Sequence, residues 1–151
     1  MKNPEVDINT RKVHELEMEG RGGKEDEYLK ILGDDWKKVN GVLHDFVNVV
    51  TGQCIELKKQ QNQQWLDPSK YTSMSESELD IPMHWVCWKK GNGVDLILES
   101  STRQMMSVMG WDRSYLDDLV KFKSKHNVPT QWKQPIRVRS FKDKFKVIYE
   151  R

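Results

Sequence analysis

The fold is decided by residues 83–100, which read MHWVCWKKGNGVDLILES. Two runs rich in β-branched and aromatic residues, 83–89 and 94–100, flank a turn at 90–93 that contains two glycines and an asparagine. These residue types adopt the positive φ angles of a tight turn, so the segment predicts a β-hairpin. Alternation along the second strand predicts that one face carries Val94, Leu96 and Leu98 and the other Asp95, Ile97 and Glu99.

Downstream of this hairpin, the pattern predicts one helix and a second pair of strands. Residues 101–111 fit either a short helix or a buried strand. Asp112 is a typical N-cap, and the helix that follows is expected to end near Lys125, before Pro129. Residues 136–140 and 145–150 then predict a second hairpin. Upstream, the serine-rich stretch 67–82 indicates a long loop.

Residues 28–57 show apolar side chains at steps of three and four, which is typical of amphipathic helices. Gly33 and Gly52 are expected to divide this region, and a long helix is predicted over 34–64 with a polar, glutamine-rich end. The predicted fold is therefore α+β: N-terminal amphipathic helices packed on an antiparallel sheet built from two hairpins, with one further helix between them. Residues 1–24 predict a flexible polar tail, and residues 25–151 a single domain.

Composition excludes several classes of protein. No apolar run approaches the ~18 residues needed to span a bilayer, and the acidic N-terminus is neither a secretory signal nor a transit peptide. An intracellular location, cytoplasmic or nuclear, is expected. Cys54 and Cys87 are too few for a disulfide framework or a thiolate zinc site, and no histidine has a partner at metal spacing. No metal site and no cofactor are predicted from these residues.

The strongest functional signal is an uneven charge distribution. Residues 113–151 contain eleven Lys and Arg against four Asp and Glu, whereas the whole chain has a net charge of +2. The main hypothesis is a non-catalytic nucleic-acid-binding protein, with DNA and RNA both open, in which a basic sheet face holds phosphates and rings stack on bases. The cations are Lys133, Arg137, Arg139, Lys142, Lys144 and Lys146, and the rings are Trp132 and Phe141. Alternatively, these cations are only the solvated face of an edge strand.

A second hypothesis is a protein-interaction module or inhibitor. The 34–64 helix would present its apolar stripe to a protein partner or to a second copy of the chain, and the tail would fold on that partner. Trp85 and Trp88, three positions apart on one strand, must project to opposite faces. An exposed Trp88 would serve as an anchor, although burial is the commoner outcome for tryptophan.

A third hypothesis is a metal-dependent nuclease. Asp80, Asp95 and Glu99 are carboxylates that the hairpin could gather around a hard divalent cation. Nucleases of the restriction type usually place a lysine two residues after the second acid. Here those positions hold Ile97 after Asp95 and Ser101 after Glu99, which weakens this assignment.

Overall fold

The computed structural model describes residues 5–16, 25–40, 44–60, 63–126 and 133–151. Within them, six strands form a mostly antiparallel sheet in the order β1-β2-β3-β5-β6-β8. These strands are β1 (Trp36–Lys38), β2 (Phe46–Asn48), β3 (Cys54–Gln60), β5 (Pro82–Lys89), β6 (Gly93–Ser101) and β8 (Lys146–Glu150). A separate ribbon pairs β4 (Gln64–Leu66) with β7 (Gln134–Ile136). The α+β class is confirmed.

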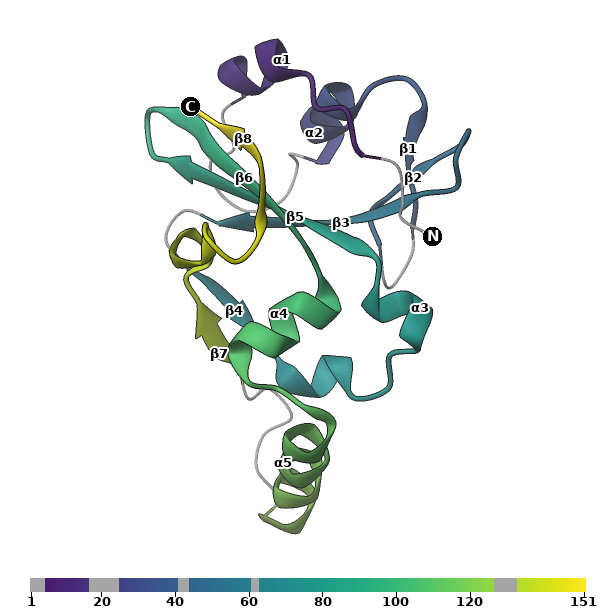
Figure 1. Ribbon diagram of the computed structural model, residues 1–151, viewed down its shortest axis with the longest axis vertical. Coiled ribbons are helices and arrows are strands. Elements are labelled where there is room, and N and C mark those ends of the chain that lie inside the picture. Colours follow the sequence, from purple (N-terminus) through teal and green to yellow (C-terminus); the bar gives the residue numbers. More distant parts are fainter. Residues whose placement is uncertain (1–4, 17–24, 41–43, 61–62, 127–132) are drawn as a thin grey trace.

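Helices lie on both faces of this sheet and at its end (Figure 1). The α-helices are α1 (Thr10–Glu15), α2 (Glu25–Leu32), α3 (Glu76–Leu79), α4 (Thr102–Met109) and α5 (Arg113–His126), and the 3-10 helices are η1 (Pro68–Tyr71) and η2 (Val138–Phe141). In Figure 1, α1 and α2 lie at one end of the molecule and α5 at the other. None of the described helices combines the length and the hydrophobicity that a bilayer-spanning segment requires.

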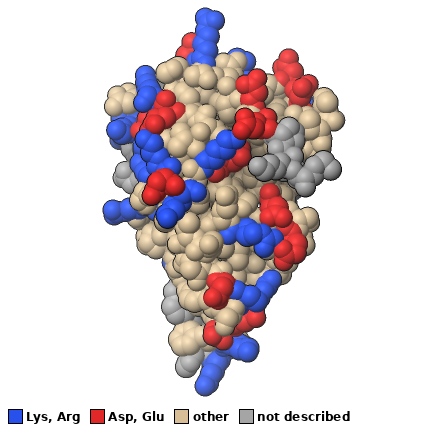
Figure 2. All heavy atoms as spheres, in the orientation of Figure 1, with Lys and Arg blue, Asp and Glu red and all other residues tan. Residues whose placement is uncertain are grey.

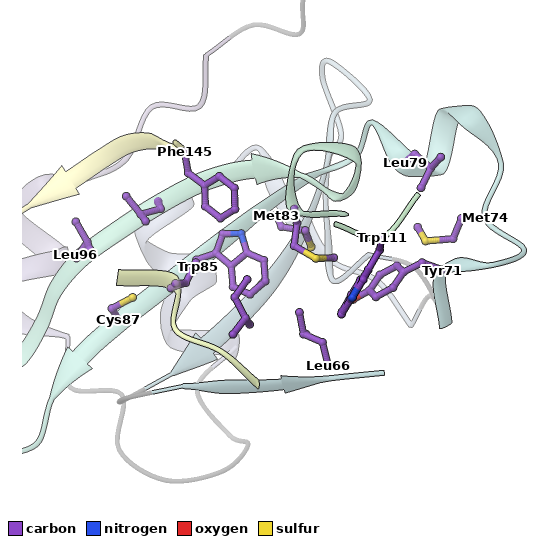
Figure 3. Close-up of a cluster of buried hydrophobic side chains, with 14 of the residues drawn as sticks. Leu66, Tyr71, Met74, Leu79, Met83, Trp85, Cys87, Leu96, Trp111 and Phe145 are labelled. Atoms are coloured by element: carbon purple, nitrogen blue, oxygen red, sulfur yellow. The ribbon is translucent and has the colours of Figure 1, made fainter. Parts of the chain in front are cut away.

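The hairpin of β5 and β6 forms where the sequence predicts it, and its strands have a core on each side. Trp85 is buried on one face and Trp88 on the other, as expected from their spacing. The α2-side core includes Val13, Leu16, Tyr28, Ile31, Phe46, Ile55, Leu57, Val86, Trp88, Val94, Ile97 and Tyr149. The α4-side core includes Leu66, Tyr71, Met83, Trp85, Cys87, Leu96, Leu98, Met105, Trp111, Leu116, Ile136, Val138 and Phe145. Figure 3 shows Trp85 beside Phe145 and Tyr71 against Trp111.

A β-bulge corrects the predicted alternation of β6. Cys87 pairs with Leu96, but Trp88 pairs with Val94, so Asp95 is an extra residue on β6. A bulge shifts the alternation by one position. Val94 consequently lies in the α2-side core and Leu96 in the α4-side core, whereas the predicted alternation placed both on one face.

The predicted long helix over 34–64 is wrong, because this region forms β1, β2, β3 and part of the β4–β7 ribbon. Gly33 has a φ angle of 106° directly after α2, and Gly52, with a φ angle of 77°, ends the turn between β2 and β3. Val50, which belongs to the predicted apolar stripe, is 73% exposed. The described residues of 34–64 therefore offer no helical stripe to a partner, and whether the protein has a protein partner stays a separate prediction.

The described part of the N-terminal segment contains a short helix that packs on the sheet. Residues 10–15 form α1, and Val13 and Leu16 are buried in the α2-side core. The main chain of Leu16 accepts a hydrogen bond from Val94 N, which ties the segment to the hairpin. Residues 1–4 and 17–24 of the predicted tail lie outside the described residues.

The predicted second hairpin is replaced by two separate pairings. β7 ends at Ile136 and pairs with β4, whereas β8 pairs with β6 at the edge of the large sheet. The chain between them turns into η2 because Val138 is buried in the α4-side core while Arg139 reaches toward β6. Asp112 does cap α5, since its Oδ1 accepts a hydrogen bond of 2.7 Å from Tyr115 N.

A buried polar chain fastens α2 to the sheet. The hydroxyl of Tyr28 and Nδ1 of His84 lie 2.6 Å apart, and His84 Nε2 lies 2.9 Å from Glu99 Oε2. A carboxylate only accepts hydrogen bonds, so Nε2 donates to Glu99 and Nδ1 is left to accept the Tyr28 O–H. The hydrogen bond from His84 lowers the pKa of Glu99, and burial raises the pKa of Tyr28.

Tyr28→Phe is expected to lower the free energy of unfolding by about 1–3 kcal/mol, because it leaves His84 Nδ1 buried without a donor. Urea denaturation measures this change. Tyr115→Phe is the matched control: its hydroxyl accepts a hydrogen bond from Gln134 Nε2 at an exposed position, where water can replace it, so the substitution should cost less than about 0.5 kcal/mol. Equal effects of the two substitutions would show that the buried chain adds no stability.

Candidate metal-dependent hydrolytic site

The strand β3 places two opposite charges side by side on the α4-side face of the sheet. Ile55 and Leu57 are buried in the α2-side core, so alternation directs Glu56 and Lys58 to the other face. Lys58 Nζ lies 3.1 Å from Glu56 Oε1, and the two side chains are only 13% and 11% exposed. The pair is therefore largely shielded from solvent and weakly screened by salt.

Asp45 brings a second carboxylate to this pair from the neighbouring strand. Its main-chain N–H donates to Ile55 O at 2.9 Å, and its Oδ2 accepts a hydrogen bond of 2.7 Å from Leu57 N. Asp45 directly precedes β2, in which Phe46 pairs with Ile55, and its carboxylate meets β3 at Leu57, the residue between Glu56 and Lys58. The Asp45 carboxylate is thus fixed by the main chain rather than by a flexible contact.

The electrostatic environment of the three groups is unusual. Burial raises the pKa of Asp45, and the negative charges of Glu25 and Glu56 add to this effect, while the Leu57 N–H opposes it. Burial lowers the pKa of Lys58, although the neighbouring Glu56 opposes the change. Both shifts favour the uncharged form of the group. Ionisable groups whose charged form is disfavoured by burial are typical of functional sites.

Other polar groups surround the pair. Lys70, on η1, has its Nζ 3.3 Å from Glu56 Oε1 and is 40% exposed, so it links the site to solvent. Gln60 is the third side chain on this face of β3, is 2% exposed, and donates through Nε2 to Cys87 Sγ. Its Oε1 is buried and has no hydrogen-bond partner in the described part of the structure.

Asp45 and Glu56 fit the ligand requirements of a hard divalent cation such as Mg²⁺. This ion is commonly bound by one or two carboxylates together with water and substrate phosphates, rather than by a complete cage of protein ligands. Across the described ranges, no group of three or more His, Cys, Asp or Glu side chains forms a closed metal site. A cation bound to Asp45 and Glu56 alone would keep its remaining positions open for water and substrate.

The three acids singled out from the sequence do not share a site. Asp80 binds Arg103 Nε at 3.1 Å, on the exposed surface near α4. Asp95, turned outward by the bulge, binds Arg139 Nη1 at 2.6 Å, and Glu99 is engaged by His84. Each carboxylate is thus engaged by a separate partner.

The cations of the predicted basic sheet face are also dispersed, because residues 137–140 do not form a strand. Arg139 forms a double hydrogen bond with Asp95, Lys146 pairs with Glu5 at 2.7 Å, and Lys142 pairs with Glu150. In the described residues no ion pair involves the exposed Lys133, Arg137 or Lys144. Phe141 is half-buried against Phe145, and Trp132 lies outside the described residues. Figure 2 shows acidic and basic side chains mixed over one face of the molecule.

Sequence reasoning missed Asp45, Glu56 and Lys58, although one signal was present. Glu56-Leu57-Lys58 has the acid-x-lysine spacing that the third hypothesis sought after Asp95 and Glu99. A strand interpretation of residues 54–60 would have placed this acid and this lysine on one face, whereas the helix interpretation separated them by about 200°. Asp45 has no such signal, since only the strand register brings it to Glu56.

Comparisons with known proteins do not indicate a function for this chain. No protein-family model matches the chain, and no curated protein is significantly similar to it. The functional proposal therefore depends on the side chains of Asp45, Glu56 and Lys58.

Proposed function

We propose that the protein is a metal-dependent nuclease that hydrolyses phosphodiester bonds at the site formed by Asp45, Glu56 and Lys58. The observation that carries this proposal is the Glu56–Lys58 pair on one strand with Asp45 fixed beside it by the main chain. Asp45 and Glu56 are assigned as ligands of a divalent cation. Such a cation supplies Lewis-acid stabilisation of the charge that develops on a phosphoryl group during hydrolysis.

Lys58 is assigned to the attacking water. It carries three donors on a flexible stem, and burial lowers its pKa, which increases the fraction of the amine that can accept a proton near neutral pH. Its position beside Glu56 keeps the amine within reach of whatever the two carboxylates hold. Lys70 is then available to a phosphate oxygen, because its side chain extends from solvent to Glu56.

The charge distribution supports a nucleic-acid substrate. Lys70, Lys133, Arg137 and Lys144 are exposed cations that could contact a phosphate backbone. The non-catalytic hypothesis explains these cations equally well. It assigns no role, however, to the shielded cluster of Asp45, Glu56 and Lys58. Hydrolysis accounts for both observations.

The proposal is tested by cleavage assays with labelled single-stranded DNA, duplex DNA and RNA. We expect cleavage in Mg²⁺ or Mn²⁺ and none in EDTA, with Glu56→Gln reducing the rate by at least about 10²-fold. Glu150→Gln, which alters an exposed glutamate paired with Lys142, is purified identically and should cleave normally. Binding without cleavage by the unaltered protein would favour the non-catalytic hypothesis. Equal cleavage by all three proteins would identify a contaminant.

A further inference from the structure

The β4–β7 ribbon has one buried face and one exposed face. Leu66 and Ile136 are buried in the α4-side core, which fixes the inward side. Trp65 and Pro135 are direct cross-strand partners and both are exposed, so they share the outward side. The Trp65 side chain is 54% exposed, which is unusual for so large an apolar ring.

Two cations flank this tryptophan. Lys133 and Arg137 directly precede and follow β7, two positions before and after Pro135, the cross-strand partner of Trp65. Residues at these positions are the diagonal neighbours of Trp65 across the ribbon, within reach of long and aromatic side chains. Both are exposed, and no ion pair to either occurs in the parts of the chain that the structure describes. The nearby carboxylate of Asp67 is engaged by the N–H and the hydroxyl of Ser69.

We propose that this face, termed the Trp65 ribbon (Trp65, Lys133, Pro135 and Arg137), binds single-stranded nucleic acid. The inference rests on the proposed function and names the form of its substrate. An exposed ring between two cations can stack on an unpaired base while the cations bind the flanking phosphates. A duplex keeps its base faces stacked inside the helix, so Trp65 would have nothing to stack on. A protein partner would require an acidic surface opposite these cations and is the competing occupant.

The ribbon also lies on the side of the sheet that carries the hydrolytic groups. Leu66 and Ile136 cover the α4-side core, and Glu56 and Lys58 project to the same face of the sheet. η1 begins directly after β4 and carries Lys70, whose Nζ is 3.3 Å from Glu56 Oε1. A strand held by Trp65 would therefore meet Lys70 on its way to the site.

The test measures fluorescence anisotropy of a labelled twenty-nucleotide oligo(dT) in EDTA, at ~50 and ~200 mM salt. Trp65→Ala should weaken binding about tenfold at both salt concentrations, since stacking involves no counterion release. Arg137→Ala should weaken binding and reduce the slope of log affinity against log salt by about one. Phe122→Ala on α5 and Lys90→Ala in the β5–β6 turn, an exposed ring and an exposed cation outside the ribbon, should change neither quantity.

Three results would overturn the proposal: unchanged affinity in Trp65→Ala, equal loss of affinity for a duplex of the same length, or no binding of the oligonucleotide by the unaltered protein. The last result would direct the search to a protein occupant. Hydrolysis of bis(p-nitrophenyl) phosphate in Mn²⁺ separates this failure from failure of the proposed function. That small diester needs only Asp45, Glu56 and Lys58, so the unaltered protein should hydrolyse it whether or not the ribbon binds the oligonucleotide.

Discussion

Lys58→Ala is expected to reduce the single-turnover rate of phosphodiester hydrolysis by about 10²- to 10⁴-fold, the usual contribution of a positioned acid–base group. The substitution removes the amine 3.1 Å from Glu56 while leaving both carboxylates in place. Metal binding should therefore persist, and substrate affinity should change little because Lys70 and the Trp65 ribbon are unaltered. Quenched-flow or gel-based measurement at saturating enzyme gives the rate directly.

The matched control for this prediction is Lys59→Ala. Lys59 is the next residue of β3, and alternation directs its side chain to the opposite face of the sheet, away from Glu56. The control should retain the full rate, which would exclude a general effect of removing one positive charge from the strand. If both variants cleave equally well, Lys58 has no part in the reaction.

The part of the fold that could be predicted from the sequence is the part set by local chemistry. The turn at 90–93 forms the hairpin because glycine and asparagine tolerate positive φ, and Gly91 and Gly93 have φ of 81° and 71°. Asp112 caps α5 for an equally local reason. The strands β1 to β3 could not be predicted in this way, because steps of three and four among Val, Leu and Phe fit helices and short strands alike.

The candidate site depends on contacts between segments that are distant in the sequence, so spacing along one strand does not indicate it. Asp95 and Glu99 satisfy the rule of alternation on a single strand, but the bulge in β6 moves Asp95 out of register and into contact with Arg139. Asp45 and Glu56 are eleven positions apart, and Asp45 reaches β3 through the Leu57 N–H and the pairing of β2 with β3. Sequence spacing alone does not encode that register.

Asp45→Asn is expected to abolish stabilisation of the protein by Mg²⁺. A ligand that binds only the folded state adds about 2.7 kcal/mol to the free energy of unfolding at a concentration 100 times its Kd. The asparagine side chain keeps an oxygen that can accept the Leu57 N–H, so the local structure should survive. It lacks the charge that attracts the cation. Urea denaturation with and without Mg²⁺ measures the difference, and Asp34→Asn, at an exposed position, should respond to Mg²⁺ as the unaltered protein does.

In EDTA, Asp45→Asn is expected to raise the free energy of unfolding. Burial raises the pKa of Asp45 in the folded state above its value in the unfolded chain. Between these two pKa values the folded state binds more protons, so the free energy of unfolding falls as the pH rises and stays lower above that window. Asp45→Asn removes this penalty and should be more stable than the unaltered protein at pH ~7, with a flatter pH dependence. A destabilised variant that still responds to Mg²⁺ would contradict both expectations, because it would mean that Asp45 supports the fold and not the cation.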